Sequence, residues 1–128
     1  GIRDLLLPLV VNGKATVPPI HQVQGNVPWL LEVCPAGALK AAGLYKPPYK
    51  GRSASHFDAR SHILKSLEND GSIQAVPPGL RDTILSNASG DALDSVVAAA
   101  VTARTVNNPA SIAAMSGEPY NVEGCIYV

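Results

Sequence analysis

Residues 91–106 read DALDSVVAAAVTARTV, and this stretch predicts the best helix of the chain. It is rich in Ala and contains neither Gly nor Pro, the two residues that most weaken a helix. Val97, Ala98 and Val101 continue one face of it, so this face is expected to pack inside the protein. The segments around it must therefore supply apolar partners.

The segments before this helix carry strand and helix signals. Residues 27–35 (VPWLLEVCP) are apolar apart from one Glu, which suits a central strand covered on both faces. Pro35 suits the first turn of a following helix, which would end at Gly43. Ser55 and Asp58 resemble a capping box at the start of a helix over 56–69. That helix is expected to turn four apolar residues inward: Phe57, Ile63, Leu64 and Leu67.

Weaker signals complete the chain. Residues 2–12 suit either a short helix or an apolar strand, and residues 13–26 an extended connection. The sequence further predicts a short strand over 72–76, a short helix over 80–87, a loop over 107–123 and a terminal strand over 124–128. The order β-α-α-β-α-α-β indicates an α/β fold.

Length and composition limit the classes of protein. At 128 residues the chain is expected to form one domain, residues 1–128, in which residues 1–26 are a leading segment and linker. A hydrophobic content of 46% is enough for a buried core. The formal net charge is zero, so a nucleic-acid partner would have to be held locally or through metal ions.

The cysteines, the histidines and the hydropathy of the chain bear on zinc binding, redox compartment and membrane association. Two cysteines without CxxC spacing and three histidines are too sparse for a zinc site. Cys34 and Cys125 are both expected to be reduced, as in the cytoplasm. The longest apolar run, residues 5–11, is interrupted by Pro8 and is too short to cross a bilayer. We therefore expect a cytoplasmic protein without a membrane partner.

Three acidic residues form the main candidate site. Asp91 and Asp94 are three residues apart and share one face of the predicted helix. Asp94 heads the apolar face and Glu32 interrupts the apolar strand, where a carboxylate is costly unless it is paired, hydrogen-bonded or bound to a cation. If strand and helix are neighbours, Glu32, Asp91 and Asp94 converge, an arrangement suited to Mg²⁺ or Mn²⁺.

Structural roles remain open for the same residues. Asp91 suits an N-cap, and acidic residues in a first turn are stabilised by the helix dipole without any ligand. Glu32 has an alternative role as the ion-pair partner of Lys40 or Arg60.

A basic loop with aromatic residues, 44–54 (LYKPPYKGRSA), is the second candidate site. Such a loop can clamp a phosphate backbone or stack on a base. A solvated loop without a ligand is the alternative, because net neutrality gives it no wider field. The candidate substrate-binding residues are Lys46, Lys50 and Arg52, with Arg60 on the following helix.

Several segments together resemble a known family. In order along the chain they are LLEVCPAGALKAAGL, YKGRS, DARSHILKSL, SGDALDSVVAAAVTAR and EGCIYV. They resemble the C-terminal half of the "domain of unknown function 429" family, from about residue 27 to residue 128. The most specific pieces are Glu-x-x-Pro-Ala, here Glu32, Pro35 and Ala36, and the DALD start of the helix at Asp91.

The resemblance implies a fold and an activity. Members of the family are predicted nucleases of the RNase H-like fold, so residues 27–128 would form the C-terminal half of that fold. Glu32, Asp91 and Asp94 would correspond to acidic positions of a two-metal centre that hydrolyses phosphodiesters with Mg²⁺ or Mn²⁺.

The chain departs from the family's pattern at its beginning. RNase H-like folds start with three antiparallel strands, the first bearing an essential Asp in an Asp-x-Gly context, and Asp4 in RDLLLP does not match it. We therefore expect a fragment, or a family member reduced to a half, that is inactive alone and forms a homodimer over its exposed sheet edge. The competing hypothesis is a non-catalytic association or binding domain whose acidic residues are caps.

Overall fold

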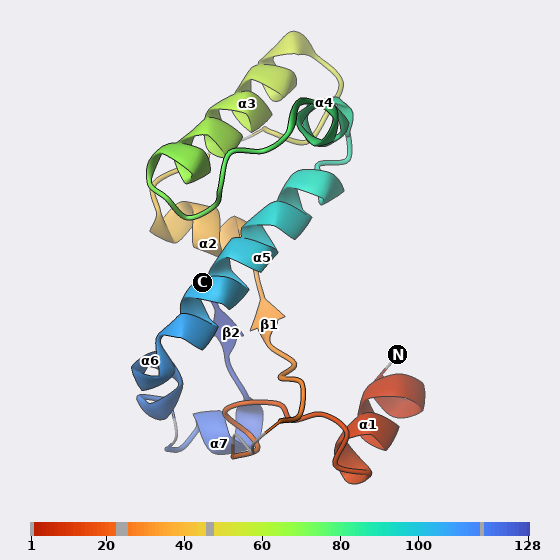
Figure 1. Ribbon diagram of the computed structural model, residues 1–128, viewed down its shortest axis with the longest axis vertical. Helices are drawn as coiled ribbons and strands as arrows, with labels where there is room; N and C mark the ends of the chain where they lie inside the picture. Colours follow the sequence, from red (N-terminus) through yellow and green to blue (C-terminus); the bar gives the residue numbers. More distant parts are fainter. Residues whose placement is uncertain (1, 23–25, 46–47, 116) are drawn as a thin grey trace. The chain divides into compact units, whose positions relative to one another are not determined.

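The computed structural model describes residues 2–22, 26–45, 48–115 and 117–128 (Figure 1). The chain forms two compact units. Unit 1 consists of Gly1–Glu32 and Thr105–Tyr127, and unit 2 of Val33–Arg104 together with Val128. The expectation of one domain over residues 1–128 stays a prediction.

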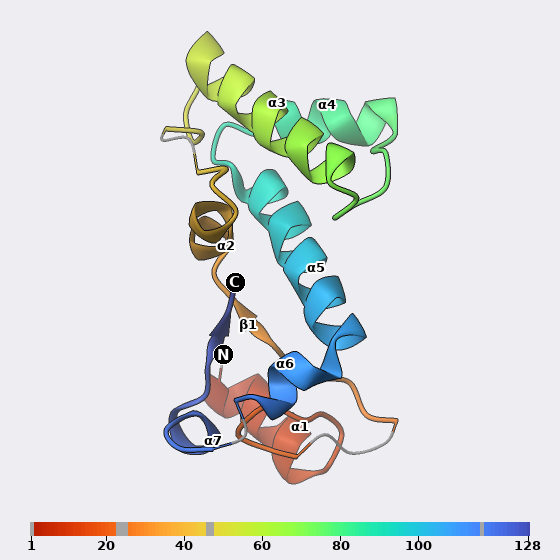
Figure 2. The same ribbon diagram turned by 90° about the vertical axis from the view of Figure 1, so that its left-hand side faces the viewer.

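Unit 2 is a group of helices around one core. Its helices are α2 (Pro35–Ala41), α3 (Ala54–Asn69), α4 (Pro78–Ser86) and α5 (Asp91–Asn107), whose last three residues are assigned to unit 1. Helices α3 and α4 pack side by side, as both views show (Figures 1 and 2). The fully buried side chains of the core are Leu39, Ile63, Leu64, Ile84 and Leu93.

Sequence features account for the limits of these helices. Pro35 and Pro78 each stand in a first turn, where the missing N–H of proline costs no helical hydrogen bond. The α3 helix begins after Ser53, whose backbone N–H donates to Nδ1 of His56 over 3.2 Å. At its other end Asp70 is the C-cap, and Gly71 follows with a φ of 77°.

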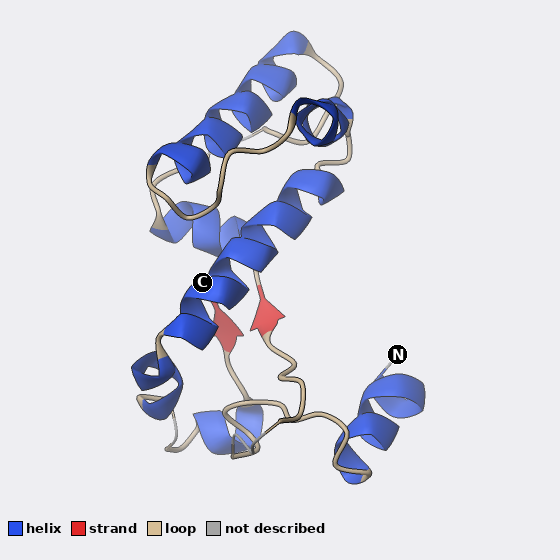
Figure 3. Cartoon of the chain, viewed as in Figure 1, coloured by secondary structure: helices blue, strands red, loops and turns tan. Residues whose placement is uncertain are grey.

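Unit 1 contains short elements. They are the π-helical turn η1 (Ile2–Leu6), α1 (Leu7–Val11), α6 (Pro109–Ala113) and α7 (Tyr120–Glu123). Strand β1 (Glu32–Val33), whose second residue is assigned to unit 2, pairs with β2 (Ile126–Tyr127) in a two-stranded parallel sheet (Figure 3). Thr16 and Trp29 form an isolated parallel bridge. The chain thus combines helices with a small parallel sheet, which confirms the α/β class in its coarse form.

The predicted central strand over 27–35 is wrong in extent and in burial. Only Glu32 and Val33 are in a strand, and no residue of 27–35 is fully buried. Pro28 cannot donate a backbone hydrogen bond, which is one reason why a regular ladder does not extend through this segment.

The α3 helix ends at Asn69 as predicted, but it begins at Ala54, and its capping box is formed by Ser53 and His56 rather than by Ser55 and Asp58. Its buried face follows the prediction except at Phe57. Ile63, Leu64 and Leu67 are buried as expected, whereas Phe57 is 43% exposed. Phe57 lies in the first turn, and the buried position one turn later belongs to Arg60, which is 3% exposed. The prediction that Phe57 faces inward is therefore wrong.

Two further segments differ from the predictions. Residues 72–76 form no strand, because the backbone N–H of Val76 donates to the Glu68 carboxylate over 2.8 Å instead of joining a ladder. Residues 107–123 contain α6 and α7 rather than only a loop, since Pro109 opens a helical turn in its favoured position. For residues 2–12 the sequence left a short helix or a strand open, and the structure shows helical turns, η1 and α1.

Candidate functional site

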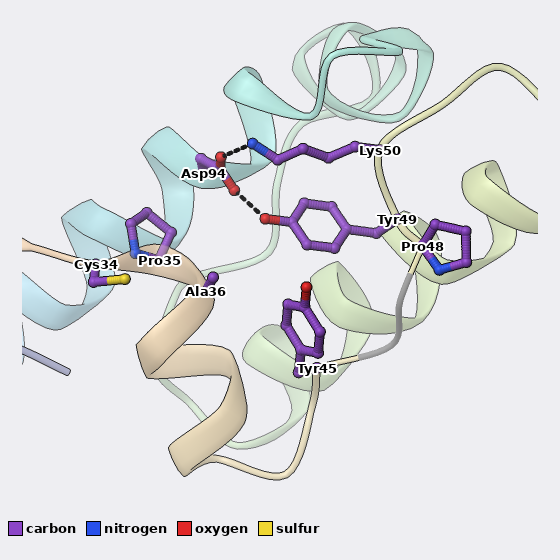
Figure 4. Close-up of a pocket in the computed structure, with 8 residues that line it drawn as sticks. All are labelled: Cys34, Pro35, Ala36, Tyr45, Pro48, Tyr49, Lys50 and Asp94. Atoms are coloured by element: carbon purple, nitrogen blue, oxygen red, sulfur yellow. Dashed lines mark hydrogen bonds and ion pairs between the residues drawn. The ribbon is translucent and has the colours of Figure 1, made fainter.

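A cavity of about 320 Å³ in unit 2 is the candidate site (Figure 4). The start of α2, the loop that follows it and α5 each contribute to its wall. The residues that line it are Cys34, Pro35, Ala36, Tyr45, Pro48, Tyr49, Lys50 and Asp94.

The backbone of the loop that carries Tyr49 and Lys50 is hydrogen-bonded to the buried Arg60. The guanidinium of Arg60 donates from Nη1 to the carbonyl oxygens of Tyr49 and Gly51, over 2.6 and 3.0 Å, and from Nε to the carbonyl oxygen of Leu85 over 2.9 Å. Because these carbonyls are withdrawn from water, the arginine supplies the hydrogen bonds that they would otherwise lack. It thereby fixes the backbone on both sides of Lys50.

Gly51 allows the same loop to pass close to α3. Its φ is 145°, and a Cβ added there would lie 2.5 Å from the ring of His56. Only a residue without a side chain fits this position. The N–H of Gly51 also donates to the carbonyl oxygen of Ala88 over 2.7 Å, which ties the loop to the segment before α5.

The carboxylate of Asp94 is engaged on both oxygens. The Tyr49 hydroxyl donates to Oδ1 over 2.7 Å, and the Lys50 ammonium donates to Oδ2 over 2.6 Å (Figure 4). Burial, and then the hydrogen bond to Asp94, raise the pKa of Tyr49 well above its ordinary value, so this phenol remains a donor. The hydrogen bond to Asp94 raises the pKa of Lys50, which keeps its charge.

Aromatic rings form another part of the wall. The rings of Tyr45 and Tyr49 meet edge to face, with centroids 6.2 Å apart and planes at 87°. The ammonium of Lys40 lies 5.1 Å from the centroid of the Tyr45 ring, and that of Lys50 lies 5.7 Å from the Tyr49 centroid. The cavity thus combines flat apolar surface with a small number of charged groups.

Asp91 lies at the edge of this arrangement. Its side chain is 76% exposed, and its Oδ1 is 4.0 Å from the Lys50 ammonium. The N–H of Ala92 donates to the side chain of Asn87 over 3.2 Å, so Asn87, rather than Asp91, supplies the side-chain cap of α5. The interpretation of Asp91 as the N-cap is therefore wrong.

The predicted site residues are only partly brought together. Asp94 and Lys50 line the cavity, and Asp91 lies near Lys50. Glu32 is exposed on β1 and does not line the cavity. Among the described residues, no group of three or more His, Cys, Asp or Glu side chains could hold a metal ion.

The predicted basic residues have different surroundings. Lys46 lies outside the described residues, and Arg52 is exposed without lining the cavity. Arg60 is buried, with three hydrogen bonds to backbone carbonyls. Both cysteines are free and half-buried, and Cys34 lies on the cavity wall.

Sequence reasoning missed the link between the two candidate sites. The sequence places Tyr49 and Lys50 in a basic loop and Asp94 in an acidic cluster, yet their side chains form one hydrogen-bonded group. They are more than 40 residues apart in the chain, so no local pattern joins them. The sequence contains one indication of this link: Asp94 heads the apolar face of its helix, where a carboxylate needs a hydrogen-bonding or charged partner.

The fold and the cavity define a helix-rich protein with a small parallel sheet and an aromatic-walled pocket that contains a few charged groups. The chain belongs to the family described as "Protein of unknown function (DUF429)", whose family model matches residues 14–119. No curated protein and no solved structure matches the chain. The family membership indicated by the sequence is thereby confirmed. Across the part of the chain that the structure describes, every helix is too short or too polar to span a lipid bilayer.

Proposed function

We propose that this chain supplies the phosphate-binding part of an RNase H-like, metal-dependent nuclease, and that it does not cleave nucleic acid alone. One observation carries the proposal. The Lys50 ammonium lines the same cavity as the half-buried Tyr45 ring, so a cation and an aromatic ring lie within reach of one ligand, whereas the Tyr49 ring is buried beneath them. The RNase H-like fold, the nucleic-acid partner and a cytoplasmic location belong to the same proposal.

The size and lining of the cavity suit one nucleotide. Small-molecule sites have volumes of roughly 300–1,000 Å³ and combine apolar walls with a few polar groups. An aromatic ring accepts any base, and each stacked base contributes about 1–3 kcal/mol. The side chain of Lys50 is 49% exposed, so its remaining N–H groups can reach a phosphate oxygen.

The family resemblance also implies Mg²⁺ or Mn²⁺, and the described residues do not fit such an ion as they are arranged. No described group of three suitable side chains exists, and both oxygens of Asp94 already accept a hydrogen bond. This supports a chain that is inactive by itself. Catalytic roles for Glu32, Asp91 and Asp94 stay part of the family-level proposal.

Binding of a fluorescently labelled single-stranded oligonucleotide tests the proposal. Fluorescence anisotropy at low salt should show binding that weakens as the salt concentration rises. Lys50→Gln and Tyr45→Leu should each weaken binding several-fold, whereas Lys65→Gln, an exposed lysine on α3, is the matched control. Equal weakening by Lys65→Gln, or no binding by the wild type, would contradict the proposal.

The same samples test the lack of activity. Incubation of the chain with oligonucleotide and millimolar Mn²⁺ should leave the strand intact on a denaturing gel. Cleavage that EDTA stops and that Asp94→Asn abolishes would show a complete active site, and the inactive part of the proposal would then be rejected.

A non-catalytic association or binding domain is the second candidate. It is favoured by the pairing of Asp94 with Tyr49 and Lys50, which gives this carboxylate a structural role without any ligand. Such a domain should melt at the same temperature in Mn²⁺ and in EDTA. The proposed homodimer is tested by light scattering, where a monomer at high concentration would count against it.

A further inference from the structure

The Lys50 ammonium lies beside two carboxylates of α5. It lies 2.6 Å from Oδ2 of Asp94 and 4.0 Å from Oδ1 of Asp91. Asp91 and Asp94 share one face of α5, and the family resemblance assigned this pair to a divalent metal ion. The structure holds a positive charge there that belongs to the chain itself.

Three features place Lys50 there. The backbone on either side of it is fixed, because Arg60 holds the carbonyls of Tyr49 and Gly51. Its aliphatic stem crosses Gly90, where an added Cβ would lie 2.9 Å from Cγ of Lys50. Its ammonium lies 5.7 Å from the centroid of the Tyr49 ring, whose hydroxyl binds the other oxygen of Asp94. These contacts hold the ammonium on Asp94, while about half of the Lys50 side chain, 49%, stays exposed.

We propose that Lys50 serves Asp94 as a built-in counter-cation and thereby keeps divalent cations away from the Asp91–Asp94 pair. A divalent ion at Asp94 would lie within a few ångströms of the ammonium, and it would also have to displace one of the two hydrogen bonds on the carboxylate. Repulsion at that distance, even screened as in water, lowers the affinity for the ion about tenfold or more. This role of Lys50 does not depend on whether the chain binds nucleic acid.

Titration with Mn²⁺ alone tests the inference, with free Mn²⁺ measured by electron paramagnetic resonance. The wild type should bind Mn²⁺ weakly or not at all. Lys50→Met removes the charge and keeps most of the stem, and it should bind Mn²⁺ about tenfold or more tightly than the wild type. Lys50→Arg keeps the charge and should behave as the wild type.

Two controls identify where the ion binds. Lys40→Met removes another lysine that lies over a tyrosine of the same cavity, and it should leave Mn²⁺ binding unchanged. The double variant with Lys50→Met and Asp94→Asn should lose the gain of the single variant. Far-UV circular dichroism at the titration temperature checks that each variant is folded.

Each result bears on the inference. Tight Mn²⁺ binding by Lys50→Met that the second substitution abolishes supports it. Equal binding by wild type and Lys50→Met, including no binding by either, overturns it. A gain that persists without the Asp94 carboxylate, or that appears equally in Lys40→Met, also overturns it, because the ion would then bind elsewhere or respond only to net charge.

Discussion

Replacement of Arg60 with Met should destabilise unit 2 strongly, although it keeps most of the aliphatic stem. The guanidinium is 3% exposed and donates three hydrogen bonds to backbone carbonyls. A hydrogen bond from a charged donor contributes about 1.5–3 kcal/mol, and an unsatisfied buried acceptor costs about 1–3 kcal/mol. The substitution also removes the desolvation cost of a buried charge that has no carboxylate partner, and this offsets part of the lost free energy. The net loss in the free energy of unfolding should be about 2–4 kcal/mol.

Thermal unfolding followed by circular dichroism measures this loss. A change of this size should lower the melting temperature by about 10 °C or more for a unit of this length. The near-ultraviolet signal of the tyrosines should also change, because Tyr49 lies on the loop that Arg60 holds. Arg52→Met, an exposed arginine of the same loop, is the matched control. If the two variants melt within about 2 °C of each other, Arg60 does not hold the loop as described.

Three other predictions follow from burial, backbone geometry and charge. Leu64→Ala should cost about 2–5 kcal/mol in chemical denaturation, whereas Phe57→Ala, at a residue 43% exposed, should cost about 1 kcal/mol or less; similar costs would contradict the burial pattern. Gly90→Ala should destabilise the protein by about 1 kcal/mol or more, because the φ of Gly90 is 80° and the new Cβ would lie 2.9 Å from Cγ of Lys50. Gly79→Ala, at an open position in the helix α4, should instead stabilise it by about 0.5–1 kcal/mol. The hydrogen bond from Arg81, and then that from the backbone N–H of Val76, lower the pKa of Glu68, so its contribution to stability is fully present above pH 4.5 and is lost as the pH falls through the lowered pKa. The difference in unfolding between Glu68→Gln and the wild type should therefore be larger at pH 7 than at pH 3, and an equal difference at both would contradict this.

Local sequence patterns were enough to predict that the helices of unit 2 exist and roughly where they lie. The Ala-rich stretch at Asp91, the proline that opens α2 and the apolar spacing of Ile63, Leu64 and Leu67 all appear in the structure as expected. Such features depend on residues three or four positions apart, which a sequence shows directly. The strand at 27–35 was harder to predict, because an apolar run does not reveal whether a partner strand pairs along its whole length.

The sequence alone determined that Asp94 would need a partner, since it heads an apolar face of a helix. It did not determine which partner. The choice of Lys50 and Tyr49 depends on the path of a loop that Arg60 holds from beneath, and that path results from tertiary packing. Either a metal ion or an ammonium can neutralise a carboxylate, and only the three-dimensional structure places the Lys50 ammonium 2.6 Å from this one.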